Sequence, residues 1–319
     1  MEYRQLGQAG VKVSRICLGT AFRGQSDDAV CLETIERALD LGCNFVDCAN
    51  YYGRGRSETI VGKALKGRRD DIVLTTKVWS KMGSGVNDSG SSRFHIMREV
   101  ERSLQRLQTD HIDVYLLHAF DAETPLEETL SAMDDLVHQG KVRYTGCCNF
   151  SAWQVAEGLW CSDVNNLVSF TCIQPQYNLL KRLEVEAELL SLCRQHGLGM
   201  MTYSPLAVGL LSGRFRRGQV LPNDTPWGQG KFNFEHAMSE QTDAVVQCLI
   251  EIAARRGKTP AQVAIAWILD HEEVTAPITG PDLPVHVDEV FGALGWQLEP
   301  PERAALDQVS QPLAPWQYV

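Results

Sequence analysis

The sequence lacks the features that would place it in a membrane, on a nucleic acid or in a secreted class. It has no apolar run of about 18 residues, which a bilayer-spanning helix requires. Its first ten residues, MEYRQLGQAG, hold no apolar segment of the kind found in secretory signals. Basic residues are in the minority: 30 Lys and Arg face 40 Asp and Glu, a formal net charge of −10. We therefore expect no membrane and no nucleic-acid partner, because such surfaces need positive charge beside phosphates.

The ten cysteines lack the pairing patterns of a disulfide framework or a metal site. They are scattered along 319 residues without a CxxC pair, and the adjacent Cys147 and Cys148 have no useful ligand spacing. The pattern predicts reduced, mostly buried thiols in a cytoplasmic protein with no bound metal. The hydrophobic fraction of 44% leaves room for a large core.

Eight short β-rich runs alternate with segments of helical spacing. Continuous apolar runs such as IDVYLL and DIVLTT lack the in-and-out alternation of a half-wet sheet, and they suit a parallel sheet covered by helices. Segments such as 126–136 carry Leu or Met every three or four residues, which predicts helices with one buried stripe. The eight runs are Ile16–Leu18, Asn44–Asp47, Ile72–Lys77, Ile112–His118, Val142–Asn149, Val168–Gln174, Gly199–Tyr203 and Thr275–Ile278.

This alternation predicts a single α/β domain over residues 1–319, folded as a (β/α)8 TIM barrel. The alternative is an open doubly wound sheet, which usually carries a GxGxxG turn after its first strand, whereas that turn reads LGTAFRGQSDD here. An N-terminal hairpin, Tyr3–Leu6 with Val11–Val13, is expected to plug the barrel floor. A long loop after strand 7, about Ser212–Gln241, is rich in Gly, Pro and polar residues, and such loops are usually functional lids or disordered.

Three consecutive predicted strands end in titratable residues, at the end of a barrel where active sites lie. NFVD ends in Asp47, IVLTTK in Lys77 and IDVYLLH in His118, and Tyr52 follows in the loop DCANYYG. A Lys ammonium lowers the pKa of a nearby phenol, and a carboxylate keeps that ammonium charged. The phenol can then act as general acid or base while a neutral His donates to a carbonyl oxygen. The quartet indicates carbonyl reduction or alcohol oxidation, although each residue alone is more often structural.

The chain resembles the aldo-keto reductase superfamily over about residues 2–310, on the segments DCANYYG, TTKVW and LLH. The resemblance implies that Tyr52 is the proton donor of a catalytic tetrad that Asp47, Lys77 and His118 complete. It also implies a nicotinamide cofactor, NADP or NAD, bound across the barrel mouth without a Rossmann fold. In detail the chain is similar to a bacterial-type branch that handles sugars, sugar-like alcohols and aldehydes.

Further segments resemble the cofactor-binding elements of that superfamily. GCCNF would place Asn149 on the carboxamide, with Cys148 where Ser is usual, and QPQYN would place Gln174 there as a second ligand. Tyr203 in YSPL would stack on the nicotinamide ring. The remaining cofactor-binding positions are Thr20, Ser204, Leu206, Gly209, Gly280, Asp282 and Asp288.

The segment after the eighth strand, PITGPDLPVHVDEV, has no Lys or Arg where the superfamily often grips the 2′-phosphate of NADP. Asp282 and Asp288 occur there instead, and a carboxylate accepts from a ribose 2′-OH but repels a 2′-phosphate. NAD is therefore an alternative to NADP. Basic residues of the long loop could supply the missing charge or form a solvated cationic surface, namely Arg214, Arg216, Arg217 and Lys231.

Aromatic side chains follow the same strand ends and suit the face of a small aldehyde, ketone or sugar. The predicted substrate pocket contains Phe22, Trp79 and Phe120. Further aromatic candidates, equally consistent with plain packing, are Trp227, Trp296 and Trp316. The sequence leaves the physiological substrate and the oligomeric state open.

The leading function is hydride transfer between NAD(P)H and a carbonyl or alcohol, as in alcohol dehydrogenases. One alternative is an NAD-dependent sugar or polyol dehydrogenase. Another is a cofactor-binding regulatory subunit without turnover, because such relatives exist in the superfamily. An aldolase or isomerase with Lys77 as a Schiff base is disfavoured, since it needs a neutral amine and Asp47 keeps the amine charged.

Overall fold

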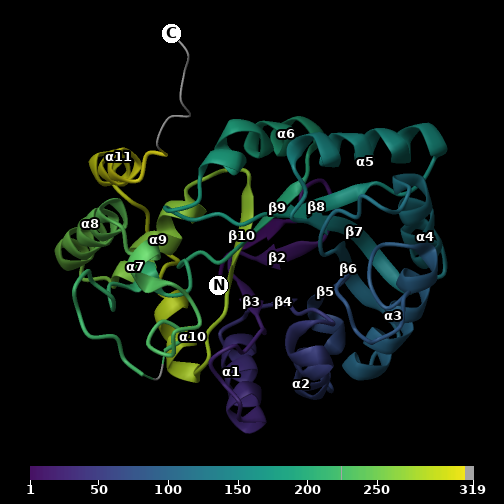
Figure 1. Cartoon of the computed structure of the whole chain (residues 1–319), viewed down its shortest axis with the longest axis horizontal. Helices are drawn as coiled ribbons and strands as arrows, with labels where there is room; N and C mark the ends of the chain where they lie inside the picture. The colour runs from purple at the N-terminus through teal and green to yellow at the C-terminus, as the bar shows by residue number, and fades with distance from the viewer. Residues whose placement is uncertain (224, 313–319) are drawn as a thin grey trace.

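The computed structural model describes residues 1–223 and 225–312. Within these residues, eight parallel strands close into a barrel in the order β10-β3-β4-β5-β6-β7-β8-β9, with helices around it (Figure 1). Two more strands pair as an antiparallel hairpin. The predicted (β/α)8 barrel with its N-terminal hairpin is therefore confirmed. The strands are β1 Tyr3–Gln5, β2 Lys12–Ser14, β3 Cys17–Gly19, β4 Phe45–Asp47, β5 Val73–Val78, β6 Ile112–Leu117, β7 Val142–Cys148, β8 Phe170–Gln174, β9 Gly199–Tyr203 and β10 Val274–Thr279.

Several helices start at residues whose side chains accept hydrogen bonds from the free backbone N–H groups of the first turn. Ser92 and Thr259 accept such hydrogen bonds ahead of α3 and α9, and Thr259 forms a capping box with Gln262. The helices are α1 Asp28–Asp40, α2 Arg56–Ala64, α3 Arg93–Leu107, α4 Leu126–His138, α5 Ala152–Asn165, α6 Leu190–His196, α7 Phe234–Ala237, α8 Glu240–Arg256, α9 Pro260–Leu269, α10 Pro284–Phe291 and α11 Pro300–Val309. Shorter helical turns are η1 Tyr52–Gly55, η2 Arg69–Asp71, η3 Val185–Leu189 and η4 Leu210–Ser212.

The barrel interior is filled by side chains from alternate strand positions and from the hairpin. Leu6 and Val13, both fully buried, belong to the same interior cluster as Phe45, Val114 and Met201. The hairpin therefore plugs the barrel floor as expected. Gly7 permits this because its φ is +60° and a Cβ there would lie 2.5 Å from the backbone nitrogen at the start of β9.

A larger core lies between the barrel and the helices. All six residues of β5 are buried, including the polar Thr75, Thr76 and Lys77, so the strand lacks the in-and-out alternation of a half-exposed sheet. The stripe predicted for 126–136 packs into this core from α4. Nine of the ten cysteines are buried, and all ten are free thiols, in agreement with the sequence-based prediction.

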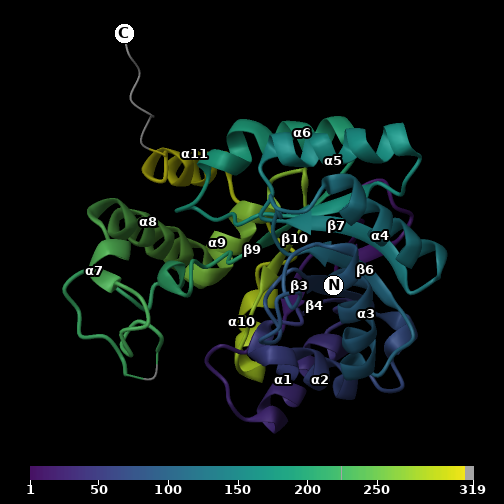
Figure 2. The same cartoon turned by 45° about the vertical axis from the view of Figure 1, so that its right-hand side comes forward.

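The loop after β9 packs around a small hydrophobic cluster of its own. Leu210, Phe215, Trp227, Phe234 and Met238 form this cluster. The loop and α7 stand at the flank of the barrel, beside α8 (Figure 2). The indole N–H of Trp227 donates to the carbonyl of Val208 at 2.9 Å, which ties the described part of the loop to the segment after β9.

No helix in the described ranges combines the length and the apolar character that crossing a bilayer would require.

Candidate active site

The barrel brings the four predicted catalytic side chains to one rim. Asp47 is the last residue of β4, Lys77 lies near the end of β5, and His118 follows β6 directly. These strands are neighbours, with Asp47 paired in register with Thr75 of β5. Tyr52 begins η1, where the chain turns back over the same rim.

Lys77 is the electrostatic centre of the site. Its side chain is fully buried, and its Nζ donates to both oxygens of Asp47 and to the carbonyl of Cys48, each at 2.7 Å. The hydroxyl of Tyr52 lies 3.5 Å from the same nitrogen. Burial alone would lower the pKa of Lys77, but Asp47 and Tyr52 raise it well above its usual value. The amine is therefore an ammonium at neutral pH.

Tyr52 and His118 are both neutral beside that ammonium. Burial raises the pKa of Tyr52 above its usual value; Lys77 acts to lower it, as expected from the sequence, but burial and Asp47 outweigh this effect. Burial, Lys77 and Arg23 lower the pKa of His118 to about 3. The two rings meet edge to face with centroids 5.9 Å apart. A protonated phenol therefore stands next to a neutral imidazole.

The predicted carboxamide ligands form a chain of contacts that joins the tetrad. The amide nitrogen of Gln174, at the end of β8, donates to Asp47 at 2.9 Å. The thiol of Cys148 donates to the Gln174 oxygen at 3.6 Å, and burial raises the pKa of this thiol to about 12. The hydroxyl of Tyr203 donates to Asn149 at 2.8 Å. Four of the predicted cofactor residues thus stand between β7, β8 and β9 at the same rim.

Backbone strain is concentrated in the loops at this rim. Nine non-glycine residues of the described chain have a left-handed φ, and seven of them follow barrel strands on the tetrad side. Such strain clusters at functional sites, where it aims backbone groups at a ligand. Val208 is the most demanding case, because a β-branched residue at φ 57° is a genuine outlier. The seven are Phe22, Arg54, Trp79, Asn149, Ser204, Ala207 and Val208.

The predicted cofactor loops meet above β3 and β10. Thr20 donates to the backbone carbonyl of Asp47 at 3.0 Å. Asp282 accepts a hydrogen bond from the backbone N–H of Gly24, and burial raises the pKa of its carboxyl. This carboxylate therefore connects the loop after β3 to the loop after β10. The other positions lie in loops directly after β9 and β10, namely Ser204, Leu206, Gly209 and Gly280.

Asp288 and two of the loop arginines are engaged elsewhere. The carboxylate of Asp288, on α10, forms a surface ion pair with Arg37 of α1. Arg216 and Arg217 pair with acidic residues of α8. A cofactor contact by any of these three would require it to give up its partner. Arg214 lies over the ring of Phe215, 5.9 Å from its centroid.

The predicted aromatic residues divide between the mouth and the packed core. Phe22 is buried and Trp79 is 36% exposed. Phe120 packs edge to face on Phe150 and Trp153, with ring centroids 5.3 and 5.8 Å away. Trp227 belongs to the cluster of the long loop, so its role there is packing. Trp316 lies outside the described residues.

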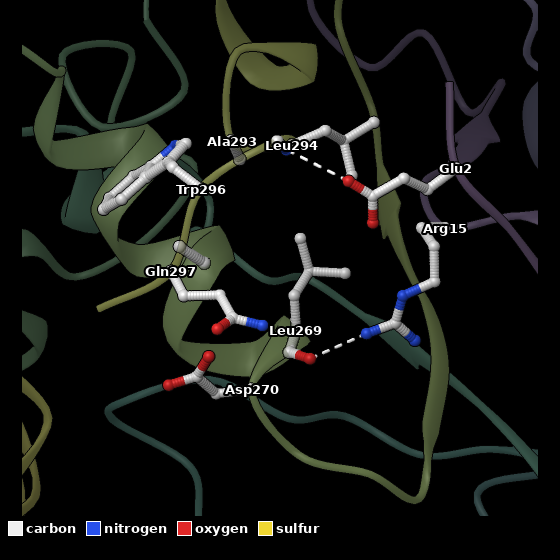
Figure 3. Close-up of a pocket in the computed structure, with 10 residues that line it drawn as sticks. Glu2, Arg15, Leu269, Asp270, Ala293, Leu294, Trp296 and Gln297 are labelled. Atoms are coloured by element: carbon white, nitrogen blue, oxygen red, sulfur yellow. Dashed lines mark hydrogen bonds between the residues drawn. The ribbon is translucent and has the colours of Figure 1, made fainter. Parts of the chain in front are cut away.

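Trp296 lies at the opposite end of the barrel. It lines a cavity of about 410 Å³ together with Arg15, Leu269 and Asp270 (Figure 3). Arg15 and Leu269 precede β3 and β10, so the cavity is at the N-terminal ends of the strands. The guanidinium of Arg15 donates to the backbone carbonyls of Leu269, Val274 and Thr275, so this half-buried cation is satisfied by the chain itself. This cavity is therefore structural rather than part of the tetrad site.

The polar groups that this chain places at the rim are of the kinds that a nicotinamide nucleotide would need. Buried polar atoms without a hydrogen-bond partner among the described residues include Nδ1 of His118 and Oγ1 of Thr279, at the ends of β6 and β10. Such atoms are costly unless a bound group satisfies them. The amides of Asn149 and Gln174 and the ring of Tyr203 lie at this rim, and a carboxamide-bearing ring needs donor, acceptor and stacking groups of these kinds.

One charged residue of the rim was not predicted from the sequence. Arg23 follows Phe22, and its charge adds to the effect of burial and Lys77 in lowering the pKa of His118. It also opposes the burial that raises the pKa of Tyr203 to about 12. The signal was present in the segment TAFRG, where a cation follows the aromatic residue assigned to the pocket.

The family model described as the Aldo/keto reductase family matches residues 15–311. A probable voltage-gated potassium channel subunit beta of Arabidopsis thaliana is 38% identical over 288 residues, 88% of this chain and 87% of the relative. An uncharacterized oxidoreductase, YrpG, of Bacillus subtilis is 37% identical over 294 residues, with the same coverage of both chains. With its barrel, its rim and these matches, the chain belongs to the aldo/keto reductase family.

Proposed function

We propose that the chain is a nicotinamide-dependent oxidoreductase that transfers a hydride between NAD(P)H and a small carbonyl or alcohol substrate. The observation that carries this proposal is the buried ammonium of Lys77, held by Asp47 and 3.5 Å from the hydroxyl of Tyr52. Membership of the family, together with a relative named as an oxidoreductase, supports the reaction class.

In the direction of reduction, Tyr52 is the general acid. Its raised pKa keeps the phenol protonated at neutral pH, so a proton is available for the carbonyl oxygen. A nicotinamide nucleotide, when bound, would supply the hydride that the carbonyl carbon accepts. The phenolate left on Tyr52 is stabilised by Lys77, which already points at that oxygen, and is reprotonated from solvent. The neutral imidazole of His118 offers an N–H donor to the same carbonyl oxygen, because its pKa of about 3 excludes the charged form.

The residues that would hold the nucleotide are those that the rim brings together. We assign Asn149, Gln174 and Cys148 to the carboxamide and Tyr203 to the ring face. The strained segment from Ser204 to Gly209 would present backbone N–H groups to the pyrophosphate, with Thr20 and Gly280 from neighbouring strand ends. Phe22, Trp79 and Phe120 would line the approach of the substrate.

The test is nucleotide oxidation with a panel of aldehydes, ketones and sugars, for NADPH and NADH separately. We expect turnover in the wild type and a loss of roughly 10²-fold or more in Tyr52→Phe, the usual worth of a general acid. Tyr51→Phe is the matched control, because Tyr51 is adjacent and half exposed. Equal activity of the two variants would refute the role of Tyr52.

NAD use by a sugar or polyol dehydrogenase is favoured by one observation. The carboxylate of Asp282 lies in the loop after β10, and no Lys or Arg occurs between Thr279 and Glu289. A carboxylate accepts from a ribose 2′-OH and repels a 2′-phosphate. Similar kcat/KM values for NADH and NADPH, or better use of NADH, would support this alternative. A hundredfold advantage for NADPH would refute it.

A regulatory role is favoured by the relatives named as potassium channel beta subunits. In that case the chain would bind nucleotide and couple its redox state to a partner protein without needing turnover. A Tyr52→Phe protein that bound nucleotide normally, had no turnover and kept its cellular role would support this function. Loss of the role together with turnover would support the enzyme.

A further inference from the structure

Helix α5 is apolar on two opposite faces, and the barrel accounts for only one of them. On the outward face, Trp153, Trp160 and Val164 are exposed by 61%, 65% and 52%. A surface helix normally carries polar residues there, and a helix that is apolar all round is normally covered on all sides. The inward face is buried against the barrel and consists of Val155, Gly158, Cys161 and Ser162.

The outward apolar residues form one continuous ridge. Trp153, Ala156, Trp160 and Val164 are spaced by three, four and four positions, so they lie in a row along the helix. This is the spacing at which one helix packs against another. We call these four residues the α5 ridge.

A groove runs beside the ridge on the same side of the molecule. It has a volume of about 320 Å³ between α5 and the η3–α6 segment, and its lining includes the small side chains of Ala152, Ala156 and Ala187. Helices α5 and α6 both lie along the upper edge of the molecule in both views (Figures 1 and 2). Large aromatic side chains and a shallow groove therefore share one surface.

We propose that a second copy of this chain packs on the α5 ridge, with α5 against α5 around a two-fold axis. A two-fold contact uses the same surface on both copies, so it requires protruding and receiving features on one face. The α5 ridge and its groove meet this requirement. In an antiparallel pairing, Trp160 of each copy lies over the groove of the other.

The exposed tryptophans supply a large share of the area that a stable dimer needs. A Trp side chain offers about 200 Å², so the observed exposures leave roughly 120–130 Å² on Trp153 and on Trp160. Four such side chains around the axis contribute roughly 500 Å², about a third of a standard interface of about 1,600 Å². Trp is also enriched among the residues that dominate binding energy.

The net charge of the chain indicates that apolar contact, and not charge attraction, holds the two copies together. Each copy carries a formal net charge of −10, so two copies repel one another at long range. Association must then come from apolar contact. Added salt screens the repulsion and leaves that contact intact, so the dimer is expected to tighten as ionic strength rises.

The test is sedimentation velocity of the full chain from about 1 to 100 μM, the range in which interfaces of ordinary size associate. We expect a dimer for the wild type and a monomer for Trp160→Glu, because the substitution should raise the dissociation constant of the dimer at least about 100-fold. Phe94→Glu is the matched control, because Phe94 is 61% exposed on α3, away from the ridge, and should remain dimeric. Trp153 is left intact because it contacts Phe120.

A second variant guards against an effect on folding. Ala156→Trp fills the groove without adding charge, and it should also give a monomer whose circular dichroism and melting temperature match the wild type. A wild type that stays monomeric at all these concentrations overturns the proposal. A Trp160→Glu protein that remains dimeric overturns it equally, because the copies would then associate through another face.

Discussion

Removing the ammonium of Lys77 tests the electrostatic design of the rim through stability as well as activity. In Lys77→Met the carboxylate of Asp47 stays buried but loses two hydrogen bonds at 2.7 Å, and the carbonyl of Cys48 loses one. Gln174 continues to donate to Asp47, which softens the loss. Breaking a buried ion pair by removing one partner costs about 3–5 kcal/mol. For a chain of this length that corresponds to a fall in melting temperature of roughly 5–7 °C.

The double variant separates the cost of an unpaired charge from the value of the pair. Asp47→Asn with Lys77→Met removes both charges, and replacing a whole buried pair by neutral groups is often nearly neutral for stability. We therefore expect the double variant to unfold within about 1 kcal/mol of the wild type, although each single variant is several kcal/mol weaker. The two variants that lack Lys77 should be inactive, because the phenolate of Tyr52 has lost its cation. Asp47→Asn should also be inactive, because burial lowers the pKa of Lys77 and the carboxylate that opposes this effect is gone.

The assays are thermal and denaturant unfolding followed by circular dichroism, with nucleotide oxidation measured on the same samples. Lys63→Met is the control for the change of residue type, since Lys63 is exposed on α2 and its loss should cost no more than about 0.5 kcal/mol. The reasoning is refuted if Lys77→Met is as stable as the wild type, or if the double variant is weaker than both single variants.

Three further predictions follow from neighbouring groups. Burial is the main cause that lowers the pKa of His118 to about 3 and that of His271 to about 4, from the usual 6.5. Below pH 6.5 the unfolded chain therefore binds protons that the folded chain does not bind. Denaturant titrations should show the free energy of unfolding falling from about pH 6.5 toward pH 4. Asp282→Asn keeps an acceptor for the loop after β3 but removes the charge, and the NADPH-to-NADH ratio of kcat/KM should rise roughly tenfold. Trp227→Phe removes the hydrogen bond to Val208, worth about 1 kcal/mol, and should raise the KM for nucleotide severalfold with kcat unchanged.

The positions of the tetrad could be predicted because strand ends define a rim in a parallel barrel. Once β4, β5 and β6 are neighbours, the residues that end them must meet, whatever their side chains are. The sign of the pKa shift on Tyr52 could not be predicted in the same way. The sequence shows the cation of Lys77, but the desolvation that outweighs it depends on how deeply the phenol is buried.

The local backbone conformation and the direction in which a helix face points also could not be predicted from the sequence. Sequence patterns point to glycine where φ is positive, so Trp79 and Val208 gave no sign of their left-handed backbone. Similarly, the spacing of Trp153 and Trp160 marks an apolar row, but only the position of α5 against the barrel shows that this row faces outward. Asp288 lies in the predicted segment yet pairs with Arg37, because α1 and α10 pack together.

The charge balance of the rim explains how it can be both buried and reactive. The charges of Asp47 and Lys77 cancel, and Tyr52 and His118 are neutral, so the four residues of the resting tetrad carry no net charge. Burying them therefore costs less than burying an unpaired charge. Proton donation by Tyr52 creates one negative charge, and the nearest cation, the ammonium of Lys77, already lies 3.5 Å away. The 2.7 Å contacts to Asp47 fix that ammonium in place, so no reorganisation is needed when the charge appears. A charged His118 would instead compete with Tyr52 as the proton donor, and burial, together with Lys77 and Arg23, prevents this by lowering the pKa of the imidazole.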